Sequence, residues 1–233
     1  MIPDNIVLTY RDYNIPPYVF DNIQKLNPDK EILFYSNDEV VQFLLKEYDS
    51  SYVDLFYSVK LGCTKGDLFR YCYLFKYGGY YCDIDIYHFE SINNYISKNT
   101  EFFSINSQAA GTTFQALLYC EAGHPIIKNC IDDLMNPESA KDLYYLTTGD
   151  MYKNIKNYLN LTDKIIAQDY TIKDKIIGIG QESMINNMWS CTYKNKVIAL
   201  SRYPNYRKMM GGTDKEIGYF TRSEEHTSEL QSH

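Results

Sequence analysis

The sequence predicts an α/β fold, built as one domain around a central mixed, mainly parallel sheet. Two observations support this class. Strand-like and helix-like segments alternate through the first sixty residues, which is the order that a parallel sheet covered by helices requires. The 233 residues also contain no repeat, linker or low-complexity segment that would divide them. A domain of this size buries roughly 70% of the surface that its unfolded chain exposes, so we expect a substantial core.

The amino-terminal third supplies the first strands and helices of this prediction. Residues 5–10 (NIVLTY) predict a strand, and Pro16-Pro17 opens a helix that runs to about residue 26. A second strand is expected over 31–36 (EILFYS), followed by a helix that Asn37 or Asp38 caps and that ends near residue 48. A short helix near 52–60 completes this part. Ligands of such sheets collect beyond the carboxyl ends of the strands, where Thr9 and Tyr10 would lie.

The most informative segment is 65–87, KGDLFRYCYLFKYGGYYCDIDIY. Its first half predicts a helix, because apolar residues recur at helical spacing and no glycine or proline follows Gly66 before Gly78-Gly79. Asp67 and Arg70 are three apart and therefore share a face of that helix. The glycine pair predicts its end, since glycine accepts left-handed backbone angles at low cost.

The residues after the glycine pair predict a strand that carries two carboxylates. The run YYCDIDIY is aromatic and β-branched, and alternation would place Tyr81, Asp83 and Asp85 on one face. Two carboxylates on one face repel unless a cation lies beside them, and Mg²⁺ or Mn²⁺ with oxygen ligands suits that need. A lone D-x-D is more often a surface pair, but its combination with an Asp–Arg pair on a preceding helix is far rarer. His88 would point to the opposite face, so we leave it out of this site.

The remaining sequence predicts further elements in the same sheet. Strands are expected over 101–106 and 115–120, and helices over 125–135 and about 144–159. Beyond residue 164 the pattern weakens: KDKIIGIG favours a strand, 181–189 a short helix that ends at Trp189, and 196–200 a last strand.

Composition excludes several functional classes. The net charge of −7 argues against a nucleic acid partner, because neutralising phosphates requires basic patches. No apolar run of 18 residues and no signal-peptide pattern appears, so we expect neither a transmembrane segment nor secretion. The six cysteines lack C-x-x-C spacing, which favours reduced, buried thiols in a cytoplasmic setting over a zinc site or a disulfide framework.

Taken together, KGDLFRYCYLFKYGGYYCDID resembles the core pattern of the glycosyltransferases with a DXD sugar-binding region. That family includes the yeast initiating mannosyltransferase, inositol-phosphoceramide mannosyltransferases and capsular polysaccharide enzymes. The resemblance implies a GT-A fold, a nucleotide-sugar donor, and Mn²⁺ or Mg²⁺ as cofactor. The chain departs from the pattern at Gly66, where Ala or Ser is more usual.

The resemblance also implies roles for individual residues. Asp67 and Arg70 would contact the donor sugar and its phosphates, and Tyr81 would lie near the diphosphate. Asp83 would lie near the ribose and the metal, and Asp85 would coordinate the metal directly.

Weaker matches flank this core and extend the resemblance over about residues 1–160. Thr9 and Tyr10 occupy the place where the nucleotide base and ribose are met, although the His and Trp of the usual opening are absent. Gln115 takes the position of an amide ahead of a G-H-P turn, and Asp150 replaces the proline of a T-G-P segment.

The activity implied by the resemblance is that of a metal-dependent, retaining hexosyltransferase. It would take a UDP- or GDP-sugar and transfer the sugar to a glycan, lipid or protein acceptor, as in polysaccharide biosynthesis. An alternative is a catalytically inactive module of the same fold that binds a nucleotide sugar or a glycan. A D-x-D phosphohydrolase fits less well, because Tyr87 stands where that chemistry expects Thr or Val.

The last twelve residues, 222–233 (RSEEHTSELQSH), resemble an in-frame translation of a sequencing-library adapter and are expected to be a non-native tail. The glycosyltransferase domain would then be residues 1–221. Because the tail holds one Arg and three Glu, the remaining 221 residues carry a net charge of −5. The carboxyl-terminal His and Ser-Trp that close over the site in this family are not visible, so we expect the natural chain to continue.

Overall fold

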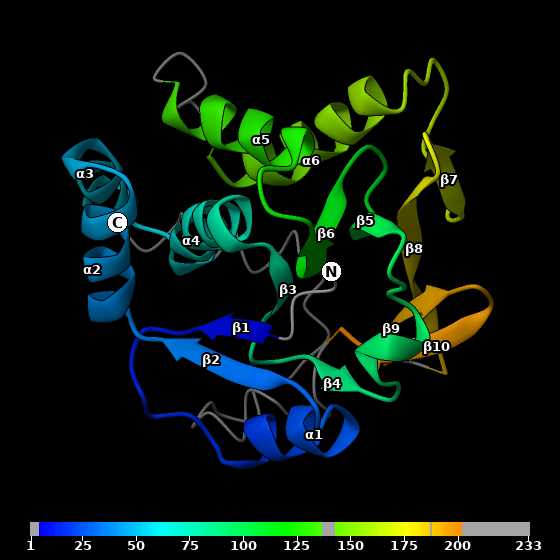
Figure 1. Cartoon of the computed structure of the whole chain (residues 1–233), viewed down its shortest axis with the longest axis horizontal. Helices are drawn as coiled ribbons and strands as arrows, with labels where there is room; N and C mark the ends of the chain where they lie inside the picture. The colour runs from blue at the N-terminus through cyan, green and yellow to red at the C-terminus, as the bar shows by residue number, and fades with distance from the viewer. Residues whose placement is uncertain (1–4, 137–142, 187, 202–233) are drawn as a thin grey trace.

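The computed structural model describes residues 5–136, 143–186 and 188–201, so the expected tail and the end of the expected domain lie outside the described residues (Figure 1). The helices are α1 (Tyr18–Leu26), α2 (Asn37–Glu47), α3 (Ser50–Ser58), α4 (Gly62–Tyr77), α5 (Pro125–Met135) and α6 (Leu143–Tyr158), with a 3-10 turn at Ile92–Asn94. The strands are β1 (Asn5–Thr9), β2 (Glu31–Tyr35), β3 (Gly79–Cys82), β4 (Tyr87–His88), β5 (Thr100–Asn106), β6 (Thr113–Cys120), β7 (Asp169–Ile172), β8 (Lys175–Ile185), β9 (Met188–Tyr193) and β10 (Lys196–Leu200).

All described strands belong to one mixed sheet with the order β2-β1-β3-β6-β5-β8-β9-β10-β4, and β7 pairs with β8. Three strand pairs are parallel: β1–β2, β1–β3 and β5–β8. The other six are antiparallel. The α/β class is confirmed, but the prediction of a mainly parallel sheet is wrong. Parallel strands need long crossover connections, and beyond α6 short hairpin turns join the strands instead.

The hairpins explain the second error of the sequence prediction. Residues 181–189, expected as a short helix, form the end of β8 and the start of β9. The backbone turns at Asn186 with φ of 50°, a left-handed angle that asparagine tolerates better than most residues. Trp189, expected at the end of that helix, is half-buried on β9. The strand predicted over 196–200 is confirmed as β10.

Most amino-terminal elements agree with the prediction, since their signals are local. Helix α2 begins with a capping box: the Ser36 hydroxyl accepts from the Glu39 amide, and the Glu39 carboxylate accepts from the Ser36 amide. Ser36 is therefore the cap, in place of the expected Asn37 or Asp38. Helix α5 covers the predicted residues, and α4 begins three residues before the predicted start.

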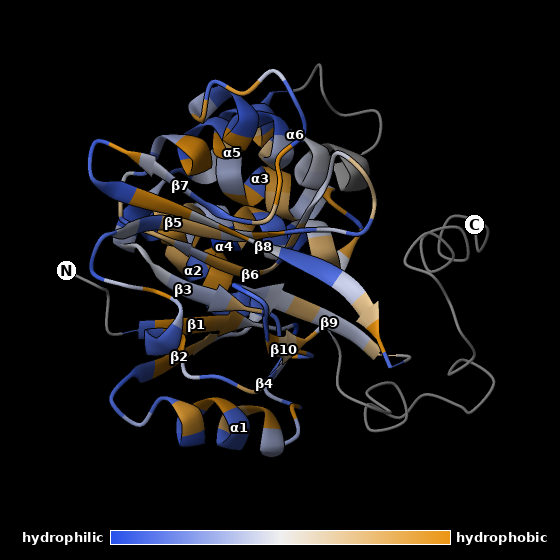
Figure 2. Cartoon of the chain, turned by 90° about the vertical axis from the view of Figure 1, so that its right-hand side faces the viewer, coloured by the Kyte–Doolittle hydropathy of each residue, from blue (hydrophilic) through white to orange (hydrophobic). Residues whose placement is uncertain are grey.

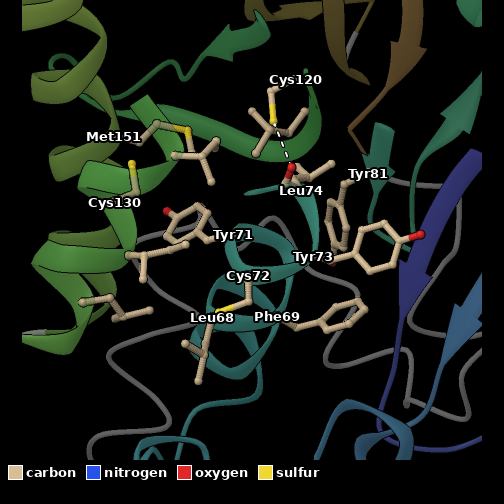
Figure 3. Close-up of a cluster of buried hydrophobic side chains, with 14 of the residues drawn as sticks. Leu68, Phe69, Tyr71, Cys72, Tyr73, Leu74, Tyr81, Cys120, Cys130 and Met151 are labelled. Carbon is tan, nitrogen blue, oxygen red and sulfur yellow. Dashed lines mark hydrogen bonds between the residues drawn. The ribbon is translucent and has the colours of Figure 1, made fainter. Parts of the chain in front are cut away.

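Two hydrophobic clusters lie on opposite faces of the sheet. Helices α2 to α6 cover one face, and Figure 2 shows hydrophobic residues gathered where these helices meet the strands. Helix α1 packs on the other face through Val19 and Ile23. Strand β1 serves both clusters, because Val7 points to the first while Ile6 and Leu8 point to the second. Figure 3 shows α4 inside the first cluster, with Tyr71 pointing toward Met151.

The described residues bear on two expectations drawn from composition, one about membrane-spanning helices and one about the cysteines. None of the helices in the described part of the chain is long and apolar enough to cross a membrane. All six cysteines are free thiols; five are buried, whereas Cys63 is exposed.

Candidate functional site

Helix α4 carries Asp67 and Arg70 on a face that is buried, and the glycine pair positions the strand that comes after it. Gly78 ends the helix with φ of 68°, and its amide donates to the carbonyl of Leu74 over 2.8 Å. A Cβ at Gly78 would approach the Ala122 amide nitrogen to 2.8 Å, so only glycine fits here. The chain then enters β3 directly, which places Tyr81 against the arginine.

Arg70 is the centre of the site and is 4% exposed. Its Nη2 lies 3.1 Å from Asp83 Oδ1 and 3.4 Å from Asp67 Oδ1, so one guanidinium joins the acids of the helix and the strand end. Nη1 donates to the carbonyl of Gln115 over 2.6 Å, and Nε donates to the carbonyl of Gly66 over 3.2 Å. Its Cζ also lies 4.4 Å from the ring centre of Tyr81.

The charges of this cluster support one another. Burial by itself lowers the pKa of Arg70, but the negative charges of Asp83 and Asp67 outweigh that effect and leave the pKa raised. The guanidinium is therefore charged at any physiological pH. Burial raises the pKa of Tyr81 well above its usual value, so its hydroxyl stays protonated and donates to Asp83 Oδ1 over 2.7 Å.

The two aspartates do not continue a strand, so the predicted alternation through Asp85 is wrong. Strand β3 ends at Cys82, and the Asp83 amide donates to the carbonyl of Ala116. The chain turns at residues 84 and 85, where the Ile86 amide lies 3.3 Å from the Asp83 carbonyl. Ile84 and Ile86 are buried on both sides of Asp85 and hold the turn in the second cluster. The structure thus brings Asp67, Arg70, Tyr81 and Asp83 together, with Asp85 two residues further along the turn.

Thr9 and Tyr10 lie at the same edge of the sheet. Strands β1 and β3 are parallel neighbours in which Val7 pairs with Tyr81, so Thr9 comes level with Asp83. The Thr9 hydroxyl donates to the Tyr35 carbonyl over 2.8 Å, and the Tyr10 amide donates to the same oxygen. The Thr9 hydroxyl is therefore used in a hydrogen bond between β1 and β2, while the ring of Tyr10 packs beside the second cluster.

Gln115 joins the site from β6 and is 3% exposed. Its backbone carbonyl accepts from Arg70, and its side-chain Oε1 accepts from the Tyr71 hydroxyl over 2.7 Å. Its Nε2 has no hydrogen-bond partner among the described residues. The sequence interpretation missed two residues here: Tyr71, which looks like any apolar helix position, and Gly66, whose departure from the family pattern was the only signal.

The carboxylates fit a divalent metal that also binds a phosphate-containing ligand. The Asp83 side chain is 32% exposed, and its hydrogen bonds from Arg70 and Tyr81 both go to Oδ1. No group of three or more His, Cys, Asp or Glu side chains in the described part of the chain could enclose a metal alone. Mg²⁺ typically binds through one or two carboxylates and completes its shell with water and substrate phosphates, and Asp83 with Asp85 offers that arrangement.

His88 does not belong to this arrangement, as the sequence interpretation expected. It lies on β4, pairs with Ala199 of β10, and is 1% exposed. Burial lowers its pKa to about 4, so the ring is neutral.

Comparison with known proteins finds a family model that is similar to this part of the chain. Residues 17–103 match the family described as "Glycosyltransferase sugar-binding region containing DXD motif". The match includes Asp67, Arg70, Tyr81, Asp83 and Asp85 but not Thr9, Tyr10 or Gln115.

Two curated relatives and one solved structure agree with this match. Over 88 residues the chain is 32% identical to mannosyl phosphorylinositol ceramide synthase SUR1 of Saccharomyces cerevisiae, and over 107 residues it is 23% identical to the uncharacterized glycosyltransferase L373 of Acanthamoeba polyphaga mimivirus. These matches span 36% and 46% of this chain but only 23% and 43% of the relatives. The PaToxG glycosyltransferase has the same fold, with a TM-score of 0.54 at 17% identity over 68% of this chain and 70% of that chain. Residues 17–103 are therefore similar to the sugar-binding region, containing a DXD motif, of a glycosyltransferase family, and over 68% of its length the chain shares its fold with a solved glycosyltransferase.

Proposed function

We propose that this protein transfers a sugar from a nucleotide-diphosphate sugar to an acceptor in a metal-dependent reaction that retains the anomeric configuration. The observation that carries the proposal is the cluster of Asp67, Arg70 and Asp83, inside the matched region. There one buried cation joins a helix carboxylate to a carboxylate at a strand end. This edge of the sheet, beyond the carboxyl ends of β1 and β3, is also where ligands of such sheets bind.

Different residues would bind the two halves of the donor, the diphosphate and the sugar. Asp83 and Asp85 would hold Mn²⁺ or Mg²⁺, which supplies positive charge for the diphosphate as it leaves. Asp67, buried beside Arg70, would accept hydrogen bonds from sugar hydroxyls. Gln115 would offer its side-chain amide nitrogen to the donor. No residue is assigned as a nucleophile, because the proposed retention comes from attack on the face that the diphosphate leaves.

The donor and acceptor classes are chosen from chemistry and from the relatives. A UDP- or GDP-sugar supplies the diphosphate that the carboxylates and metal would grip. A glycan, a lipid and a protein are all acceptors to test. The yeast relative is a mannosyl phosphorylinositol ceramide synthase, which favours including a mannose donor and a ceramide-based lipid in the first trials.

Thermal stabilisation tests the donor site directly. The chain is heated with UDP or GDP, each with and without Mn²⁺. Binding at a hundred times the dissociation constant adds about 2.7 kcal/mol of stability, which is easily measured. A metal-dependent shift with one nucleotide supports the proposal and selects the nucleotide. No shift with either nucleotide, in this chain or in a longer product of the same gene, contradicts it.

A catalytically inactive binding module is the second candidate, supported by two departures from the family pattern, Gln115 and Asp150. The two candidates differ in turnover. Release of free sugar or a glycosylated product from a bound donor supports the transferase. Metal-dependent binding of the same donor without any product supports the module.

A further inference from the structure

Arg70 is engaged by the protein on every nitrogen, which bears on the role that the family pattern implies for it. Nε, Nη1 and Nη2 bond to Gly66, Gln115 and Asp83, and a face of the guanidinium packs against the ring of Tyr81. The side chain is 5% exposed. An arginine has five N–H groups in a fixed fork, so this arrangement leaves little capacity for a donor phosphate.

Asp83, by contrast, is fixed on one side and open on the other. Its Oδ1 accepts from Arg70 Nη2 over 3.1 Å and from the Tyr81 hydroxyl over 2.7 Å, and its amide is bonded to the Ala116 carbonyl. The carboxylate is nevertheless 32% exposed. Bonds to one oxygen of a carboxylate fix its rotation and therefore fix where its second oxygen points.

Gly66 controls the space that this arrangement needs. A Cβ at Gly66 would lie 3.2 Å from Arg70 Nη2 and 3.9 Å from the Tyr81 hydroxyl oxygen. The first distance is tighter than most real Cβ contacts, so Nη2 would have to give way by a few tenths of an ångström to a side chain at this position. The glycine thus permits the observed contact between Arg70 and Asp83.

We propose that Gly66, Arg70 and Tyr81 are positioning residues that act through Asp83: they aim its Oδ2 at the metal, and Arg70 does not bind the donor diphosphate directly. This inference rests on the proposed function. Residues that orient a metal-binding carboxylate typically change metal affinity by 10- to 100-fold when they are altered, whereas a direct phosphate contact changes nucleotide binding whether or not metal is present.

The test measures the Mn²⁺ concentration that half-saturates the nucleotide-dependent thermal shift, together with the shift produced by nucleotide alone. Tyr81→Phe removes one bond to Asp83 Oδ1, and Gly66→Ala displaces the other donor. We expect each variant to raise the Mn²⁺ midpoint about tenfold and to leave the metal-free shift unchanged. Because both act on one oxygen, the double variant should be less impaired than the product of the single effects.

Controls separate this role from general damage. Tyr80→Phe also deletes a buried phenol hydroxyl, which contacts Tyr95 at 2.8 Å in the second cluster, and it should leave the Mn²⁺ midpoint unchanged. Gly66→Ala should not lower the melting temperature of the free protein, since alanine favours a helix by up to about 1 kcal/mol over glycine.

Arg70→Lys keeps the charge but loses the fork, and it distinguishes the two roles of the arginine. A raised Mn²⁺ midpoint with unchanged metal-free binding supports the inference. An equal loss of nucleotide binding with and without Mn²⁺ in this variant overturns it, as do unchanged midpoints in Tyr81→Phe and Gly66→Ala. If the unaltered protein shows no metal-dependent nucleotide shift, the proposed function fails, and the inference fails with it.

Discussion

Burial has opposite effects on two sets of ionisable side chains in this domain. Arg70 is buried with Asp67 and Asp83, and their negative charges keep its pKa raised although burial opposes its charge. His88 and His124 are equally buried, but burial dominates and lowers the pKa of each to about 4. A buried charge is thus retained where carboxylates bond to it closely, as at Arg70, and given up where burial outweighs the nearby negative charge, as at His124.

The partners explain this contrast. The ring nitrogens of His88 have no hydrogen-bond partner within the described residues, and its nearest aromatic neighbour is Tyr80. His124 caps α5 by accepting from the Ile126 amide, and its ring packs against Phe102. The neutral His124 ring can accept this hydrogen bond and so stabilises the start of α5. In the charged cluster, in contrast, Asp67 and Asp83 depend on Arg70, because removing the arginine leaves the charge of buried Asp67 without this cation.

Removing the cation should cause the largest effect. Arg70→Met leaves Asp67 buried beside an apolar side chain, and breaking a buried ion pair in this way typically costs about 3–5 kcal/mol. We expect the free energy of unfolding, measured in urea at pH 7, to fall by that amount. The matched control is Arg11→Met, because that arginine pairs with Asp12 on the surface with its side chain 70% exposed. The control should change stability by no more than about 0.5 kcal/mol. Equal losses in both variants would show that Arg70 is not the centre of a buried cluster.

Asp85→Ala should separate activity from folding. Removing one group that stabilises developing charge typically costs on the order of 3 kcal/mol or more, equivalent to at least a hundredfold loss of sugar transfer. The fold should remain intact, since buried Ile84 and Ile86 hold the turn. Transfer rate and urea midpoint are measured together, with Asp132→Ala on the surface of α5 as the control. Unchanged turnover with Mn²⁺ present would remove Asp85 from the site.

Lowering the pH should destabilise the folded protein, because His88 and His124 are buried as neutral rings. Their folded pKa values near 4 lie below the unfolded value of about 6.5, so the unfolded chain binds protons that the folded chain excludes. Relative to acid conditions, each neutral histidine thus adds to the free energy of unfolding. This contribution is complete above pH 6.5 and is lost as the pH falls toward 4, at about 1.4 kcal/mol per pH unit for each histidine. Urea midpoints between pH 7 and pH 5 measure this loss.

Variants assign the loss to each ring. His88→Phe and His124→Asn should each flatten the curve by a similar amount, because burial lowers both pKa values to about 4. A pH profile that both variants leave unchanged would mean that other groups cause the acid sensitivity.

The same contrast shows how far the sequence could predict the site. The charged cluster arises from local signals: an Asp–Arg pair at helical spacing, a glycine stop and two aspartates just beyond it. Those signals predicted α4, its end and the convergence of Asp67, Arg70 and Asp83. They did not predict the turn at Asp85, because β3 ends where its neighbour β6 stops pairing with it, and pairing with a distant strand is invisible in a local pattern.

The second half of the sheet was harder for the same reason. The order β5-β8-β9-β10-β4 joins strands separated by up to about a hundred residues, and alternation in 181–189 competes with an apparent helical pattern. The role of Gln115 was predicted only as an amide near the donor. Its bond from Tyr71 and the carbonyl contact with Arg70 depend on how α4 packs on β6.

Asp67→Asn should have the smallest effect, and it tests whether Asp67 contacts the sugar or the nucleotide part of the donor. Asp67→Asn removes one negative charge but leaves Arg70 paired with Asp83, so it should cost far less stability than Arg70→Met. If Asp67 accepts hydrogen bonds from the donor sugar, the variant should weaken use of the complete nucleotide sugar about tenfold, the loss expected for a charge-assisted hydrogen bond. Binding of UDP or GDP alone with Mn²⁺ should stay the same, because neither contains that sugar. Affinities for the nucleotide and for the nucleotide sugar are compared by titration. Equal losses for both ligands would place Asp67 at the diphosphate, and the division between helix and strand carboxylates would then be wrong.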